Sequence, residues 1–451
     1  MRKLRAVAVF GALSLTLACG GGSGGGGGNG GGGGGGGIAG CSNGTSPGPS
    51  GNAIAVSAVN VAAITVDGGL PNTGYVNGVF TTVIVCFPGS KSNCNTISHV
   101  LVDTGSYGLR LLQGPTTSTA GGELTVALPP QTDALGNSIA ECAQFSDGIT
   151  WGSVRMADIY IGGTAPMAGE SALNVPVQVI GDPGFNTVPS ACTSFGTPED
   201  TLSKLLANGI IGVGPFPQDC GFGCAPGTTS NPGLYYACPS GGCTTSSQPT
   251  TEPVNAQVQN PVAVFSTISP ATTADNNGDI VELPSVPATG LAVVNGSLVF
   301  GIGTRNNNGL GSTPVYTADP NTSNITTVFG GQTYASSFID SGSNGYFFPS
   351  TIPKCTNNAG FYCPTTNLTC SATSTGTNAK QTTINFNVAN ADQLSGADNA
   401  FNNLAGPNNP PPGGSTGFDW GLPFFYGRNV YTGMEGATMP AGVPPGPFYA
   451  Y

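Results

Sequence analysis

Residues 99–109, His-Val-Leu-Val-Asp-Thr-Gly-Ser-Tyr-Gly-Leu, and residues 337–347, Ser-Phe-Ile-Asp-Ser-Gly-Ser-Asn-Gly-Tyr-Phe, repeat one pattern. Each segment is an apolar strand that ends in an Asp-Thr/Ser-Gly-Ser turn and continues into a second apolar run. The turns present Asp103 and Asp340 at strand ends. Two like charges at close range cannot both ionise, so a facing pair would supply an acid and a base. A single Asp-Gly turn is common, but the repeat with its apolar flanks predicts a functional carboxylate pair.

The N-terminus has the features of an export signal. Three basic residues among the first five precede an apolar stretch over residues 6–18, which is too short to span a membrane. Residues 15–19, Leu-Thr-Leu-Ala-Cys, resemble a bacterial lipobox, which implies removal of a signal peptide over residues 1–18 and lipidation of Cys19. An ordinary cleaved signal peptide is the alternative.

A glycine tract follows this signal. Residues 20–37 are glycine except for Ser23 and Asn29, and such a segment has no side chains from which to build a core. We therefore expect residues 19–51 to form a disordered tether. It would hold an exported domain at the periplasmic or cell-surface face of the bacterial cell envelope.

The charge balance excludes nucleic acid as a partner. The chain has 11 Lys and Arg against 22 Asp and Glu, a formal charge of −11, so no basic patch is available. Contact with the membrane is expected through the lipid anchor only. Charged residues make up 7% of the chain, and a surface of uncharged polar groups indicates tolerance of acid.

The cysteine count predicts disulfides. Of 13 cysteines, 12 remain once Cys19 is lipidated, an even number in an exported protein, which allows six bridges. Short loops favour Cys86–Cys94 and Cys355–Cys363, and Cys142–Cys192 is a third candidate. Pairing within one cluster stays open, as do the partners of Cys41 and Cys370; the cluster comprises Cys220, Cys224, Cys238 and Cys243. A zinc site is the alternative for that cluster, but the export signal favours disulfides.

Strand-like composition runs along most of the chain. Runs rich in Val, Ile and Thr, separated by Gly and Pro turns, occur at residues 52–66, 77–87, 124–128, 152–161, 175–180, 280–283, 296–302 and 382–388. A helix is predicted over residues 198–206, with two acidic residues in its first turn. The class is therefore all-β with few short helices. A Cys-rich insertion covers residues 218–258, and the halves are expected at residues 52–262 and 263–451.

Several other chemistries find little support. His99 is the only histidine, so Ser–His–Asp or Cys–His catalysis would have to use it, and a packed strand histidine is the better interpretation. The chain lacks a Walker-type phosphate loop. Residues 275–279, Asp-Asn-Asn-Gly-Asp, depart from the EF-hand spacing and are typical of a turn. We expect neither a metal nor a cofactor.

Over residues 75–445 the chain resembles the pepsin-like aspartic proteases. The resemblance rests on Asp103-Thr104-Gly105-Ser106, Asp340-Ser341-Gly342-Ser343, the apolar-Gly segments 208–214 and 420–425, the strand 296–301, and a flap hairpin at Phe145-Ser146-Asp147-Gly148. It implies a bilobal double β-barrel with Asp103 and Asp340 at the junction. The chain also resembles an uncharacterised family of bacterial lipoproteins, which supplies no activity.

The resemblance also implies roles for the flanking residues. Thr104 and Ser341 would hydrogen-bond across the junction, and Ser106 and Ser343 would bond the outer carboxylate oxygens. A water between the carboxyls would attack the peptide carbonyl, with the pair titrating as a unit. The implied partner is a peptide or protein substrate, and the implied protein is a monomer.

Two positions depart from the family pattern. Phe145 stands where the family has a flap tyrosine, which removes a hydrogen bond to substrate or water. Arg110 stands where the family has the tryptophan that pairs with that tyrosine, and a nearby cation could lower the pKa of a carboxyl that must stay protonated. These departures leave two hypotheses open.

The first hypothesis is a membrane-tethered aspartic endopeptidase that uses Asp103 and Asp340. The second is an inactive protein of the same fold that binds a peptide or glycan in the interlobe cleft. A glycosidase is a third possibility, but its two carboxyls would stand about 5–9 Å apart, wider than a pair that shares a proton.

Cys19→Ala should move the protein from the membrane fraction into the soluble fraction, because the lipid on this thiol is the expected anchor. Cell fractionation and N-terminal sequencing of the wild type and the variant test this. A wild-type protein that is soluble and begins at another residue would show the lipoprotein interpretation to be wrong.

Overall fold

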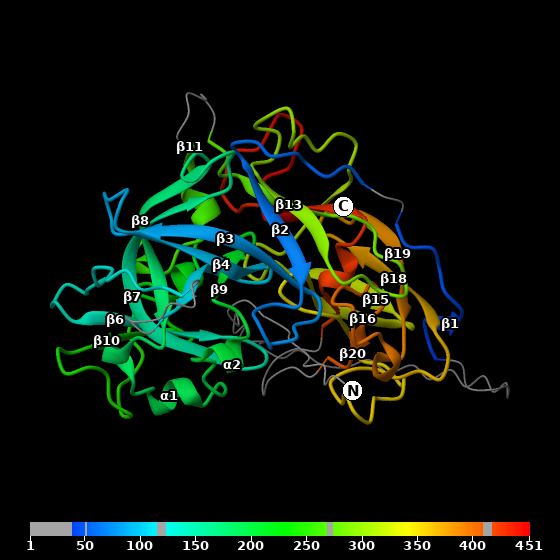
Figure 1. The fold of residues 1–451 in the computed structure, drawn as a ribbon, viewed down its shortest axis with the longest axis horizontal. Helices are drawn as coiled ribbons and strands as arrows, with labels where there is room; N and C mark the ends of the chain where they lie inside the picture. The colour runs from blue at the N-terminus through cyan, green and yellow to red at the C-terminus, as the bar shows by residue number, and fades with distance from the viewer. Residues whose placement is uncertain (1–37, 50–51, 115–122, 268–273, 409–416) are drawn as a thin grey trace.

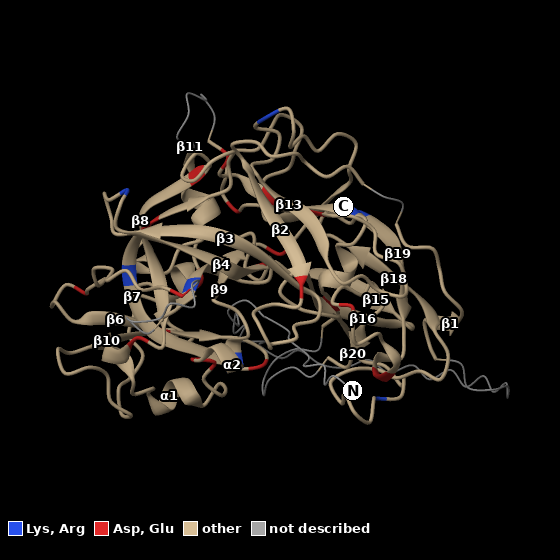
Figure 2. Ribbon diagram, in the orientation of Figure 1, with Lys and Arg blue, Asp and Glu red and all other residues tan. Residues whose placement is uncertain are grey.

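A computed structural model describes residues 38–49, 52–114, 123–267, 274–408 and 417–451. The expected signal peptide, the lipidation site Cys19 and the glycine tract lie outside these ranges. Strands are the main regular structure, with 39% of residues against 7% in helices, which confirms the all-β class (Figure 1). Lys and Arg are few and scattered over both halves (Figure 2).

The N-terminal half forms a closed β-barrel. Its strands are, in hydrogen-bonding order, β3 (Gly78–Cys86), β4 (Cys94–Asp103), β9 (Gly209–Val213), β5 (Tyr107–Leu112), β8 (Glu170–Ile180) and β7 (Ile149–Ile161). The barrel closes because β7 pairs with both β8 and β3. Three further strands extend it: β6 (Ser138–Gln144) on β7, β10 (Tyr235–Cys238) on β6, and β11 (Ser266–Thr267) on β8.

The same sheet continues into the second half of the chain. From β3 it runs through β2 (Val61–Asp67), β13 (Val294–Phe300), β12 (Gly278–Leu283), β22 (Arg428–Gly433), β23 (Phe448–Ala450) and β14 (Val315–Thr317). The crossing point is the antiparallel pair β2–β13, seen at the centre of Figure 1. Shared backbone hydrogen bonds therefore join the two halves into one structure.

A second sheet curves into a half-barrel in the C-terminal half. Its order is β1 (Cys41–Asn43), β18 (Leu368–Thr375), β15 (Ile325–Phe329), β16 (Gln332–Ile339), β21 (Asp419–Trp420), β17 (Tyr346–Phe347) and β20 (Ala405–Gly406), with β19 (Gln381–Val388) on β18. Aromatic side chains fill it, and the Phe418 and Trp420 rings stack with centroids 4.3 Å apart. This packing anchors β21, which carries part of the site described below.

Helices are short wherever the chain is described. They are α1 (Ser190–Thr193), α2 (Leu202–Leu205) and the 3-10 turns η1 (Pro183–Phe185), η2 (Gly221–Cys224), η3 (Val254–Ala256), η4 (Pro261–Val264), η5 (Ala391–Gln393) and η6 (Leu422–Phe424). The prediction of a helix over 198–206 was too long. Pro198 forms a β-bridge with Ile149, and the Glu199 amide donates to the Ile149 carbonyl at 2.7 Å. The residues expected to form the first helical turn are therefore extended and pair with β7. A strand predicted over 124–128 is reduced to an isolated bridge between Leu124 and Gln113.

Six disulfides join the twelve cysteines of the described ranges. The three predicted bridges, Cys86–Cys94, Cys142–Cys192 and Cys355–Cys363, are confirmed. The open cluster pairs as Cys220–Cys224 and Cys238–Cys243, which leaves no thiolate for the zinc alternative. Six bridges indicate an oxidising compartment. Within the described part of the chain, no helix has the length and apolarity needed to cross a membrane.

The sixth disulfide, Cys41–Cys370, changes the expected extent of the tether. Residues 41–43 form β1 and pair with β18, although they fall inside the range assigned to a disordered segment. A covalent bond and strand pairing outweigh the low hydrophobicity on which that prediction was based. Ordered chain therefore begins before residue 51.

Candidate active site

In each half a third strand is threaded between the two strands that flank the Asp-Thr/Ser-Gly-Ser motif. In the first half, β9 runs parallel to β4 and antiparallel to β5, with Gly212 opposite both Asp103 and Gly108. In the second half, β21 runs parallel to β16 and antiparallel to β17 in the same way. An added β-carbon at Gly212 would lie 2.4 Å from the Tyr107 amide nitrogen, and one at Gly421 would lie 2.1 Å from the Gly345 carbonyl. Glycine is required at both positions because backbone fills that space.

Reciprocal hydrogen bonds lock the two motifs together. The Thr104 amide donates to Ser341 Oγ at 3.1 Å, and the Ser341 amide donates to Thr104 Oγ1 at 2.9 Å. The hydroxyls in turn donate to the opposite strands, Thr104 Oγ1 to the Ile339 carbonyl at 3.0 Å and Ser341 Oγ to the Val102 carbonyl at 2.7 Å. All four bonds are buried. The two hydroxyls predicted from the resemblance are thus brought together, each as both acceptor and donor.

Each carboxyl is held by its own turn. The Gly105 amide donates to Asp103 Oδ1 and the Gly342 amide donates to Asp340 Oδ1, both at 2.8 Å. On the outer oxygens, Ser106 Oγ donates to Asp103 Oδ2, and Ser343 Oγ donates to Asp340 Oδ2 at 2.7 Å. Such bonds fix the rotamer of each carboxyl and favour its charged form.

The two carboxyls lie against each other. A β-carbon added at Gly342 would stand 2.7 Å from Asp103 Oδ1 and 3.1 Å from Asp340 Oδ1, so only glycine leaves room for the pair. A hydrogen bond joins the carboxyls, and neither residue has exposed surface. Burial raises the pKa of both, and the charge of Asp103 raises the pKa of Asp340 further. One proton shared by the pair follows from these directions.

A third buried acid, Asp419, was not among the site residues predicted from the sequence. It precedes Trp420 on β21 and has no exposed surface. Neither of its oxygens has a hydrogen-bond partner of normal geometry. The nearby Ser343 hydroxyl lowers the pKa of Asp419 somewhat, but that hydroxyl already donates to Asp340. Burial therefore raises the pKa of Asp419 well above its ordinary range.

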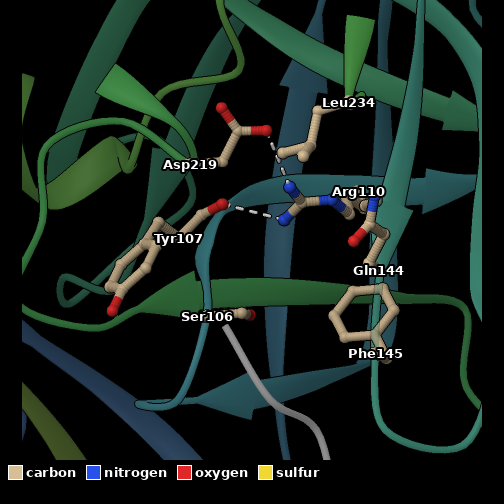
Figure 3. A pocket seen from close by; sticks show the side chains of 8 residues that line it. Ser106, Tyr107, Arg110, Gln144, Phe145, Asp219 and Leu234 are labelled. Carbon is tan, nitrogen blue, oxygen red and sulfur yellow. Dashed lines mark hydrogen bonds and ion pairs between the residues drawn. The ribbon is translucent and has the colours of Figure 1, made fainter. Parts of the chain in front are cut away.

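Arg110 lies in a buried polar cluster beside the first motif (Figure 3). Its guanidinium donates to the Tyr107 carbonyl at 2.8 Å, to Glu141 Oε1 at 2.5 Å and to Asp219 Oδ2 at 3.2 Å. Tyr235 completes the cluster by donating to Asp219 Oδ1 at 2.6 Å. One cation between two acids leaves an excess carboxyl, and burial followed by the Glu141 charge raises the pKa of Asp219 well above its ordinary range.

This cluster corrects the expectation for Arg110. The guanidinium does lower the pKa of Asp103, but it is the smallest of the causes, because Glu141 and Asp219 neutralise it. Burial has the larger effect, so the pKa of Asp103 is raised. Arg110 therefore does not lower the pKa of Asp103 enough to remove the proton shared by the pair.

The predicted flap is a β-hairpin formed by β6 and β7. Its tip spans residues 145–148, and the Phe145 amide donates to the Gly148 carbonyl at 2.9 Å. Ser146 and Asp147 lie at the tip between them. A small cavity of about 10 Å³, room for about one water, is lined by Ser106, Tyr107, Arg110, Ala143, Gln144, Phe145, Asp219 and Leu234 (Figure 3). The cavity therefore lies between the hairpin and Ser106, whose hydroxyl bonds Asp103.

A family model described as "Protein of unknown function (DUF3443)" matches residues 56–451. The chain belongs to this family. The comparison with curated proteins found no match. The family description names no activity, so the chemistry has to be argued from the carboxyl pair and its surroundings.

Ser341→Ala should lower the free energy of unfolding by about 3 kcal/mol. It leaves the Thr104 amide and the Val102 carbonyl buried without partners, at about 1–3 kcal/mol each. Urea unfolding at pH 5 measures this. Ser203→Ala, at an exposed hydroxyl on α2, is the matched control and should change stability by less than about 0.5 kcal/mol. Equal effects of the two variants would contradict the reciprocal lock.

Stability should fall as pH rises from about 4 to about 8. Burial raises the pKa of acids throughout the fold: Asp103, Asp219, Asp279, Asp340 and Asp419, with Glu170 at about 8 and Glu252 and Glu282 at about 7. Above the ordinary carboxyl pKa near 4, the folded state therefore binds more protons than the unfolded state, and the free energy of unfolding decreases with pH.

Urea midpoints at pH 4, 6 and 8 and constant ionic strength test this direction. Glu282→Gln should flatten the curve between pH 4 and 8, because it removes one acid that is protonated only in the folded state. A stability maximum at neutral pH would contradict the expectation. Two acids oppose the trend: the pKa of Asp182 is lowered by its contacts with Ser153, Gly184 and Arg155 despite burial, and that of Asp133 is lowered by hydrogen bonds led by the Asn137 side chain.

Proposed function

We propose that the protein is an aspartic endopeptidase of pepsin-like architecture that uses Asp103 and Asp340. The observation that carries the proposal is the carboxyl pair: two matched turns, reciprocally hydrogen-bonded, with both acids buried and in contact. This arrangement suits acid–base chemistry because the two groups cannot both ionise. It also argues against a glycosidase, whose carboxyls need a wider separation.

The architecture supports the same proposal at the level of the fold. Each half presents its Asp at the end of a strand that flanks a threaded strand, β9 or β21. A sheet shared by the halves holds the motifs face to face. The β6–β7 hairpin lies beside the cavity at Ser106, where a covering flap would be expected.

The residues suggest how hydrolysis would proceed. The ionised carboxyl of the pair would take a proton from a water, whose oxygen then bonds to the peptide carbonyl carbon. The protonated carboxyl would give its proton to the carbonyl oxygen. Collapse of the tetrahedral intermediate breaks the C–N bond, and the amine leaves with the proton that the first carboxyl took. One hydroxyl of the intermediate returns its proton to the second carboxyl as the product carboxylic acid forms, so the pair again holds one proton. Gly105 and Ser106 would stabilise the charge on Asp103 through the cycle.

A second candidate function is peptide or glycan binding without turnover. Phe145 supports this candidate, since it lacks the hydroxyl that a tyrosine at the hairpin tip would offer to a substrate. The complete burial of Asp103 and Asp340 supports it as well, because hydrolysis requires the hairpin to open. Tethering to a bacterial membrane through Cys19 and action as a monomer on a peptide or protein partner belong to the proposal in either form.

An unfolded protein substrate should be cleaved fastest in mildly acidic buffer, where the pair holds one proton. Asp103→Asn and Asp340→Asn should each reduce cleavage by about 1,000-fold, because an amide keeps the shape of the carboxyl but cannot act as a base. Mass spectrometry of the products over pH 3–8 measures this. A peptide analogue with a hydroxyl at the scissile position should block the wild type.

Asp398→Asn is the matched control, since Asp398 is a partly exposed carboxyl in a loop of the second half. It should leave cleavage unchanged. No cleavage by the wild type at any pH, with the hydroxyl analogue still bound, would reject the endopeptidase and favour the binding protein.

A further inference from the structure

The two halves differ at one position beneath the carboxyl pair. In the first half, Ile210 on β9 lies opposite Leu101 and Arg110 on the flanking strands. In the second half, Asp419 on β21 lies opposite Phe338 and Phe347 in the matching register. An acid thus occupies the place that an apolar side chain fills in the related half.

Local structure does not account for this acid. Asp419 is fully buried and neither of its oxygens has a hydrogen-bond partner of normal geometry. An isolated buried carboxyl costs free energy, and an apolar side chain such as the isoleucine of the first half would avoid that cost. Backbone contacts fix its position beside the pair: the Asp340 amide donates to the Trp420 carbonyl at 3.1 Å, and the Leu422 amide donates to the Ser343 carbonyl at 2.7 Å.

Among the described residues, the charge that acts on Asp419 is that of Asp103 on β4. Other titratable groups surround the carboxyl pair: Tyr107 on β5 and Tyr449 on β23 interact with Asp340, and Arg110 on β5 interacts with Asp103. Tyr346 on β17 and Arg428 on β22 interact with each other. Burial raises the pKa of all three tyrosines above 10, so they stay neutral below that pH. Arg110 is paired with Glu141 and Asp219, and Arg428 donates to the Phe424 carbonyl and interacts with Tyr346 and Tyr451, so neither arginine pairs with Asp419.

We propose that Asp419 is a positioning residue for the proton of the Asp103–Asp340 pair. The charge of Asp103 raises the pKa of both Asp340 and Asp419, and a charge on Asp419 raises the pKa of Asp340. Asp419 therefore disfavours loss of the last proton of the pair. The one-proton state of the pair extends to higher pH than it would with an apolar residue at position 419. The enzymatic consequence rests on the proposed function, whereas the retained proton is a property of the folded protein.

Asp419→Asn tests the retained proton directly. With carbon-13-labelled aspartate, the carboxyl resonances of the pair are assigned from Asp103→Asn and Asp340→Asn and followed by NMR from pH 3 to 9. The high-pH step of the pair should move to lower pH by about one unit in Asp419→Asn, because a neighbouring negative charge is removed. If the wild type cleaves peptides, the alkaline limb of its pH profile should move by the same amount while the acid limb stays in place.

Glu252→Gln is the matched control, because Glu252 is also buried, with a pKa raised to about 7 by burial and by the charge of Asp133, and its amide donates to the Cys224 carbonyl. It should leave the titration of the pair unchanged. Asp419→Ile places the residue type of Ile210 at this position and should shift the high-pH titration step of the pair as Asp419→Asn does. It replaces Asp419→Asn in the test if that variant does not fold. An unshifted pair in a folded Asp419 variant overturns the proposal. A shifted pair without cleavage supports it and rejects only the proposed function.

Discussion

The reciprocal bonding of Thr104 and Ser341 is the constraint on which the rest of the site depends. Each side chain accepts from the opposite amide and donates to the opposite strand, so neither motif can shift without breaking buried hydrogen bonds. The β2–β13 pairing brings the halves together, and this lock holds the two motifs, and with them the carboxyls, against each other. The raised pKa of Asp340 is a direct result, since part of it comes from Asp103.

Buried acids are the second feature of the molecule. Only 7% of residues are charged, yet Asp103, Asp340, Asp419, Asp219 and Asp279 are all inside. In a low-dielectric interior such groups are neutral unless paired, and the fold supplies few cations to pair them. We expect a protein built in this way to be most stable in acid. That agrees with the acid tolerance indicated by composition, but the cause lies in the interior as well as at the surface.

The sequence predicted what is local or repeated. Runs of Val and Ile located β2, β3, β7, β8 and β12, and the short loops located Cys86–Cys94 and Cys355–Cys363, because the information for each lies within a few residues. The repeated motif located both carboxyls and the hydroxyls that join them.

What the sequence could not supply depends on contacts between distant segments. Cys41–Cys370 joins residues 329 apart, and the bridge of Pro198 to Ile149 shortens a helix that local propensity favoured. Asp419 becomes visible only through the register of β21 with β16 and β17. The sequence Asp-Trp-Gly alone does not show that Asp419 lies beside the carboxyl pair, because this follows from the pairing of β21 with the two strands of the second motif.

Contacts between distant segments also explain Arg110 on β5, which departs from the family pattern. Considered alone, Arg110 would be expected to lower the pKa of a carboxyl that must stay protonated for catalysis. In the structure it is one member of a set with Glu141, Asp219 and Tyr235, all buried and mutually hydrogen-bonded. Replacing Arg110 alone by tryptophan would leave two buried acids without their cation, so it would destabilise the fold rather than restore a flap partner. The wall beside Asp103 is therefore a buried polar network in which the Arg110 cation compensates the carboxyls of Glu141 and Asp219.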